Sequence, residues 1–155
     1  MTFTPFNAFN PTYGNVTAAS LTVTGNVSAQ ADLNLTGHLN DLGITPTVNA
    51  GGQAGTTPPA PVVPQGTNDD SGLISFGTGT TPAAGVMVAI TFATAWVVPG
   101  GGAPHIVLTE QNLATKNLGL FVTGTSPTGF NVSCVNAPAA SQGNTTYQFS
   151  YHVRG

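Results

Sequence analysis

The chain has 155 residues, and only 5% of them are charged, against roughly 25% in a typical soluble domain. Lys116 and Arg154 are the only lysine and arginine, so no basic patch exists to neutralise phosphates or anionic lipid headgroups, and nucleic acid and membrane partners are excluded. The 20 glycines and 12 prolines, with many threonines and asparagines, disfavour long helices and predict an all-β fold.

So little charge favours association, and we expect the chain to work as part of an assembly. Cys134 is the single cysteine, which rules out an intramolecular disulfide. The first residues lack the basic and apolar regions of a secretory signal. The longest mostly apolar stretch, Val86–Val98, is shorter than the roughly 20 residues of a membrane helix. We therefore expect synthesis in a cytoplasm without an anchor of the chain's own.

Residues 1–19 are predicted to form an irregular N-terminal arm, because prolines interrupt an otherwise helical spacing of aromatic residues. A terminal peptide with several aromatic side chains needs another surface to cover them. We interpret the arm as a peptide that docks into a larger partner; the alternative is that it packs back on its own trimer. The predicted docking residues are Phe3, Phe6, Phe9 and Tyr13.

Residues 20–44 contain an internal repeat, in which Leu21–Val27 recurs twelve residues later as Leu33–Leu39. Each copy alternates apolar and polar residues and then turns at a glycine, which is typical of a strand with one buried face. Because so few strands cannot form a core alone, we expect three chains to wind about one axis as a trimeric β-rich stalk. The predicted axis residues are Leu21, Val23, Val27, Leu33, Leu35 and Leu39.

His38 lies within this repeat, and three copies of it could bind a metal on the trimer axis. It falls on the polar side of its strand, however, so we favour a solvated or hydrogen-bonding histidine and predict no metal.

Residues 45–71 are rich in proline and glycine, with Pro58, Pro59, Pro61 and Pro64 favouring an extended polyproline conformation. This composition predicts a semi-rigid linker between the stalk and a C-terminal head.

Residues 72–155 are predicted to form that head as an antiparallel β-sandwich or small barrel of short strands separated by turn residues. In Val86–Phe92, we expect Val86, Val88, Ile90 and Phe92 to share one face. In the last strand, alternation places Tyr147, Phe149, Tyr151 and Val153 on one face. The expected strands are Leu73–Phe76, Val86–Phe92, Ile106–Thr109, Leu118–Val122, Phe130–Val135 and Tyr147–Val153.

Four segments of the head, Gly72–Gly79, Pro104–Thr109, Gly129–Val132 and Tyr147–Val153, resemble the C-terminal head domains of bacteriophage fibres and of head-fibre or capsid decoration proteins. The segment Leu21–Leu39 is similar to the repeats of phage tail-fibre shafts. The resemblance implies a trimer with outward-facing heads, some of which bind host-surface carbohydrate. Long tail fibres also carry a large attachment domain and a long shaft, and this chain has only a short arm, which favours decoration of the capsid or a head fibre.

Catalytic motifs are absent from the sequence: it has no nucleophile elbow, no zinc-protease helix motif, no paired cysteines and no phosphate loop. We therefore expect no enzyme and no cofactor. Asp69 and Asp70 could ligate calcium with Asn68, but we favour a solvated acidic pair. His105 and Glu110 flank one strand and are interpreted as a surface pair.

Trp96 could stack on a sugar, but as the only tryptophan it is expected in the core.

These expectations combine into a non-enzymatic structural protein on a virion surface, assembled in the host cytoplasm. The expected partners are two further copies of the chain and the major capsid protein or another virion protein. The alternative is a tail fibre or receptor-binding tip that binds host-surface glycans through loops such as Gly124–Gly129 and Ala137–Asn144.

Overall fold

The computed structural model describes residues 43–98, 100–140 and 147–155. These residues belong to one compact unit, which runs from Asn40 to Gly155. The predicted arm and most of the predicted stalk, with every predicted docking and axis residue and His38, lie outside the described residues. Those expectations stay predictions.

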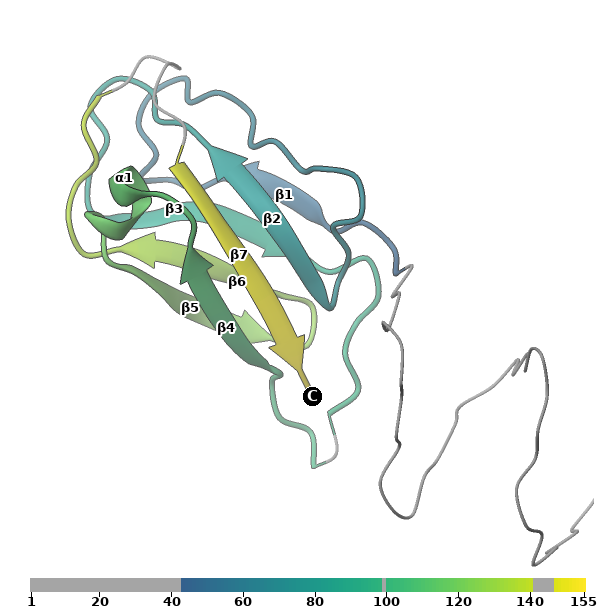
Figure 1. Cartoon of the computed structure of the whole chain (residues 1–155). Helices are drawn as coiled ribbons and strands as arrows, with labels where there is room; N and C mark the ends of the chain where they lie inside the picture. The colour runs from purple at the N-terminus through teal and green to yellow at the C-terminus, as the bar shows by residue number, and fades with distance from the viewer. Residues whose placement is uncertain (1–42, 99, 141–146) are drawn as a thin grey trace, which may run out of the picture. The chain divides into compact units, whose positions relative to one another are not determined.

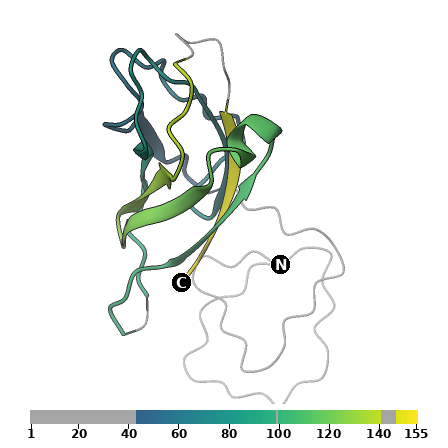
Figure 2. The same ribbon diagram turned by 90° about the vertical axis from the view of Figure 1, so that its left-hand side faces the viewer.

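Seven strands and one short helix make up the described part, and every strand pairing is antiparallel (Figures 1 and 2). The predicted all-β class is confirmed. The strands lie in two open sheets, and they do not close into a barrel. The four-stranded sheet has the order β1 (Thr47–Ala50), β3 (Gly85–Thr91), β6 (Gly129–Cys134) and β5 (Leu120–Ser126). The three-stranded sheet has the order β2 (Ser71–Phe76), β7 (Tyr147–Arg154) and β4 (His105–Glu110).

One hydrophobic core draws side chains from both sheets. Along β7, Tyr147, Phe149, Tyr151 and Val153 are buried, as their alternation predicts, because successive side chains of a strand point to opposite faces. The ring of Tyr151 contacts that of Phe130 on β6 at a centroid distance of 5.5 Å. Aromatic side chains therefore fill the space between the sheets.

The strand β3 departs from the predicted alternation. Its register against β6 shifts between Val86 and Val88, which marks a β-bulge. A bulge inserts one extra residue and turns the following side chains to the other face. Met87 and Val88 are therefore both fully buried, whereas Val86 is only partly buried.

Residues 45–71, for which composition predicts a linker, contribute to the sheets. Thr47–Ala50 pairs with β3 as an edge strand, and Val62 forms an isolated bridge with Ser75 on β2. Prolines near Val62 remove the backbone donors that a longer ladder needs, so pairing there is limited to one bridge. The structure therefore differs from the free spacer that the prolines suggest.

A single helical turn, α1 (Leu113–Lys116), connects β4 to β5. Asn112 caps it by accepting a hydrogen bond from the backbone of Thr115 at 2.9 Å. The buried hydroxyl of Thr115 in turn accepts a hydrogen bond from the Gln148 amide at 2.7 Å, which connects the helix to β7.

Among the residues that the structure describes, no helix is long and apolar enough to cross a membrane.

Candidate functional site

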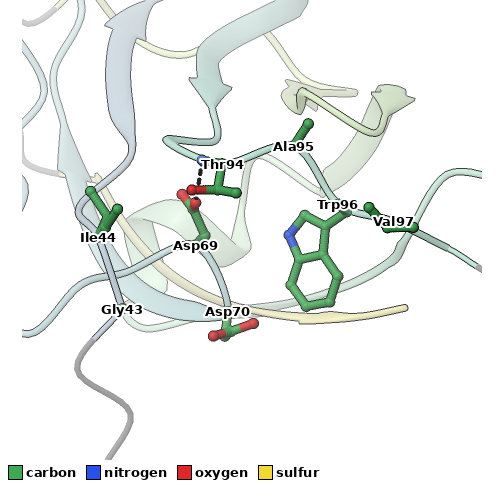
Figure 3. Close-up of a pocket in the computed structure, with 8 residues that line it drawn as sticks. All are labelled: Gly43, Ile44, Asp69, Asp70, Thr94, Ala95, Trp96 and Val97. Atoms are coloured by element: carbon green, nitrogen blue, oxygen red, sulfur yellow. Dashed lines mark hydrogen bonds between the residues drawn. The ribbon is translucent and has the colours of Figure 1, made fainter. Parts of the chain in front are cut away.

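The described surface has a pocket of about 360 Å³ at the end of the head where the described chain begins (Figure 3). Gly43 and Ile44 form one side of it. Asp69 and Asp70, which precede β2, form a second side, and residues 94–97, which follow β3, form a third. The pocket therefore combines two carboxylates with the only tryptophan of the chain, Trp96.

Asp69 holds two walls of this pocket together. One carboxylate oxygen accepts a hydrogen bond from the Ala93 amide and the other from the Thr94 amide, both at 2.9 Å. Hydrogen bonds to an ionised acceptor are stronger than those between neutral groups. The carboxylate thus connects the loop before β2 to the loop after β3, and both of its oxygens already serve the fold.

Asn68 shapes the same loop from within. Its side-chain oxygen accepts hydrogen bonds from the backbone amides of Asp70 and Ser71 at 2.9 and 2.8 Å, an Asx-type turn that starts β2. Its carbonyl oxygen accepts a hydrogen bond from the Tyr151 hydroxyl. With these groups engaged in the fold, the arrangement favours a structural role for Asn68 and Asp69 over the calcium site considered from the sequence.

The Tyr151 hydroxyl reports the electrostatics of this region. Burial raises its pKa, and the negative charges of Asp69 and Asp70 raise that pKa further. Tyr151 therefore remains a protonated donor to Asn68 at any physiological pH.

Trp96 lies where the core meets the pocket. Its ring contacts the Phe92 ring edge to face, at a centroid distance of 6.3 Å and an interplanar angle of 63°. It packs against the hydrophobic core but is only partly buried, so part of the indole faces the pocket. Trp96 is therefore partly a core residue, as expected from the sequence, and partly accessible from the pocket.

His105 and Glu110 do not act as a pair. They stand at opposite ends of β4, and the odd spacing places their side chains on opposite faces of the sheet. Glu110 instead accepts a hydrogen bond from the Leu120 amide at 3.0 Å and so joins β4 to β5.

The β5–β6 turn and residues 137–140, the described part of the second loop proposed for glycan binding, lie at opposite ends of the head. The β5–β6 turn is next to the pocket, because the Phe92 and Trp96 amides donate to Thr128 and Pro127 at 2.9 and 2.8 Å. Ala139, in the other loop, accepts a hydrogen bond from the Thr78 hydroxyl beyond the far end of β2. These two loops therefore do not form one binding surface.

Sequence analysis missed one cluster, which is created by strand register. His105 on β4 lies directly opposite Arg154 on β7, and His152 is two residues before Arg154 on the same face. The only available signal was the alternation of β7, which puts His152 and Arg154 on the face opposite to Tyr151 and Val153. The contribution of β4 could not be anticipated without the pairing.

Cys134 is buried in the core as a free thiol. The part of the chain that the structure describes contains no group of three or more histidine, cysteine or acidic side chains placed to hold a metal.

No protein-family model, no curated protein and no solved structure matches the chain significantly.

Proposed function

We propose that the chain is a non-enzymatic structural protein of a bacteriophage particle, a trimeric capsid decoration or head-fibre protein. In this proposal residues 1–19 dock on the major capsid protein or another virion protein, and residues 20–44 form the trimeric stalk. The two sheets pack as a β-sandwich head that faces outward. The phage assignment rests on the sequence resemblance, and the assembly role has support from the structure as well.

The observation that carries the assembly role is the uncharged outer face of the four-stranded sheet. Strand register and burial assign the outward, at least partly exposed positions to small or neutral residues: Thr47, Asn49, Ala89, Thr91, Phe121, Thr123 and Asn131. The surface of a soluble monomer is typically about 25–35% charged. A face without charge can be buried against protein without leaving an ion desolvated.

Exposed apolar side chains on and next to the same sheet also support a role in assembly. Phe121 is 43% exposed and Val135 is 65% exposed. Phe121 lies on β5, and Val135 lies in the bend directly after β6, the neighbouring strand. Exposed apolar groups of this kind favour contact with another protein.

Sedimentation equilibrium of the full chain at micromolar concentration tests the oligomeric state. We expect the mass of a trimer, because the stalk repeat needs symmetry mates to bury its apolar face. A stable monomer would contradict the proposal. Imaging intact particles by cryo-electron microscopy with a label on this chain then tests its position, and labels confined to the tail tip would favour the receptor-binding alternative.

A further inference from the structure

The charges of the described head are unevenly distributed. Five charged residues occur in the described part, namely Asp69, Asp70, Glu110, Lys116 and Arg154. Two of them line the pocket, and Arg154 is at the end of β7, next to Gly155, whose backbone lies against Trp96. Opposite charges are therefore concentrated at one end of the head, the end where the chain enters from residue 42.

The positive side of this end is the cluster of His105, His152 and Arg154, which we call the basic corner. Register places His105 opposite Arg154 and Val107 opposite His152. All three basic side chains are exposed, and they share the outer face of the three-stranded sheet. The corner contains one permanent positive charge and two imidazoles, out of only five basic side chains in the whole chain.

The negative side is the pocket of Asp69, Asp70 and Trp96, which we call the acidic pocket. Its volume of about 360 Å³ can accommodate a long side chain. The hydrogen bonds from Ala93 and Thr94 fix the Asp69 carboxylate, so the negative charge is held in place before any partner arrives.

We propose that the basic corner of one copy docks on the acidic pocket of the next copy. A three-fold assembly joins two different surfaces of the same chain at every interface. The corner and the pocket differ in sign and lie at the same end of the head. An aromatic wall beside carboxylates also suits a guanidinium group, which stacks on rings and pairs with carboxylates. This contact rests on the proposed trimer and names the head surfaces that it uses.

Charge reversal in the full-length chain tests the contact. Arg154→Glu makes the corner negative and leaves the pocket negative, whereas Asp70→Arg cancels the net charge of the pocket, because Asp69 remains, and leaves the corner positive. Each variant alone therefore removes the attraction of opposite charges at every interface. We expect its trimer to dissociate, on dilution at low salt, at a concentration about tenfold higher than wild type.

An equimolar mixture of the two variants tests whether the corner and the pocket interact between copies or only within one chain. Each mixed trimer regains one interface between a wild-type corner and a wild-type pocket, and in a second interface the two reversed side chains have opposite charges. The mixture should therefore be a stronger trimer than either variant alone. Lys116→Glu, which reverses a basic charge on α1 outside both surfaces, is the matched control and should behave as wild type. Mass photometry gives the trimer fraction. The emission of Trp96, the only tryptophan, reports the pocket directly.

The possible results distinguish failure of the proposed contact between heads from failure of the proposed trimer. If wild type is a trimer but the mixture is no stronger than the single variants, the contact is wrong and the trimer stands. If wild type is monomeric, both proposals are overturned. Should Arg154→Glu lose its β-type circular dichroism, His152→Glu replaces it as the corner variant. A Trp96 response to added monosaccharides that is independent of protein concentration would assign the pocket to a glycan and overturn the contact.

Discussion

Tyr151 is the residue on which the pocket end of the head most depends. Its ring is fully buried against Phe130, and its hydroxyl donates to the carbonyl oxygen of Asn68, which lies 83 positions earlier in the chain. A single side chain thus joins β7, β6 and the loop that leads to Asp69.

Removing only the hydroxyl isolates this bond. Tyr151→Phe keeps the ring but leaves a carbonyl without its donor, so the free energy of unfolding should fall by about 1–2 kcal/mol. Urea denaturation followed by circular dichroism measures the change. Thr125→Ala, which removes an exposed hydroxyl from β5, is the control and should lie within about 0.5 kcal/mol of wild type. Equal stability of wild type and Tyr151→Phe would mean that the bond contributes nothing.

The raised pKa of Tyr151 makes the free energy of unfolding depend on pH, and the direction of the shift fixes the sign of this dependence. Because the pKa is higher in the folded state, the folded chain holds the phenol proton more tightly than the unfolded chain. The resulting stabilisation is complete below a pH of about 10, the ordinary pKa of tyrosine, and is lost as the pH rises above it. Between about pH 10 and 11 the wild type should therefore lose more stability than Tyr151→Phe.

At the scale of elements, periodicity located the six strands from Leu73 onward, and all six are present with shifted ends. Burial alternates along the whole of β4 and β7, because each has one face toward the core. The sequence could not reveal the β3 bulge, since Val86 and Met87 are both apolar and only the pairing with β6 decides which is buried. The turn α1 is too short for a helical period to show.

The strand β1 and the pocket were missed for a related reason. Proline and glycine content reports local preference, whereas Thr47–Ala50 is a strand because β3 offers it an edge. Likewise, Asp69 and Asp70 were visible as an acidic pair, but the meeting of Asp69 with Ala93 and Thr94 depends on how two distant strands end. Long-range pairing, which no local pattern encodes, accounts for these differences.

Two truncations test whether residues 45–71 belong to the head. A chain of residues 43–155 retains β1 and the Val62 bridge, so we expect a cooperative β-type melt. A chain of residues 68–155 loses both, together with the fully buried Ala54 and the core contacts of Val48 and Val63. Its free energy of unfolding should be lower by about 3 kcal/mol or more, given the usual value for burying such side chains. Identical melting of the two chains would restore the linker interpretation.

At the scale of the whole molecule, the proposed assembly uses different forces in the head and in the predicted arm. The proposed contact between heads uses charges on an otherwise neutral surface, and salt should weaken it. The arm contains no charged side chain between Thr2 and Ala19 and offers aromatic rings instead. Attachment to the particle should therefore respond to salt in the opposite way from association between heads.

Attachment through the arm can be tested on particles. Each buried aromatic side chain stabilises a contact by roughly 1.5–3 kcal/mol, and three arms on one trimer add through effective concentration. Deleting residues 1–13, or replacing Phe6 and Phe9 with alanine, should leave the trimer folded and abolish its co-sedimentation with particles. Thr2→Ala with Thr4→Ala alters the same peptide without removing a ring and should preserve attachment. Wild-type attachment should also persist in 1 M salt, because screening acts on charges and leaves apolar burial intact. If the truncated trimer still co-sediments, or if moderate salt strips the intact protein from particles, the anchor is not the aromatic arm, and the repeat at Leu21–Leu39 becomes the segment to mutate next.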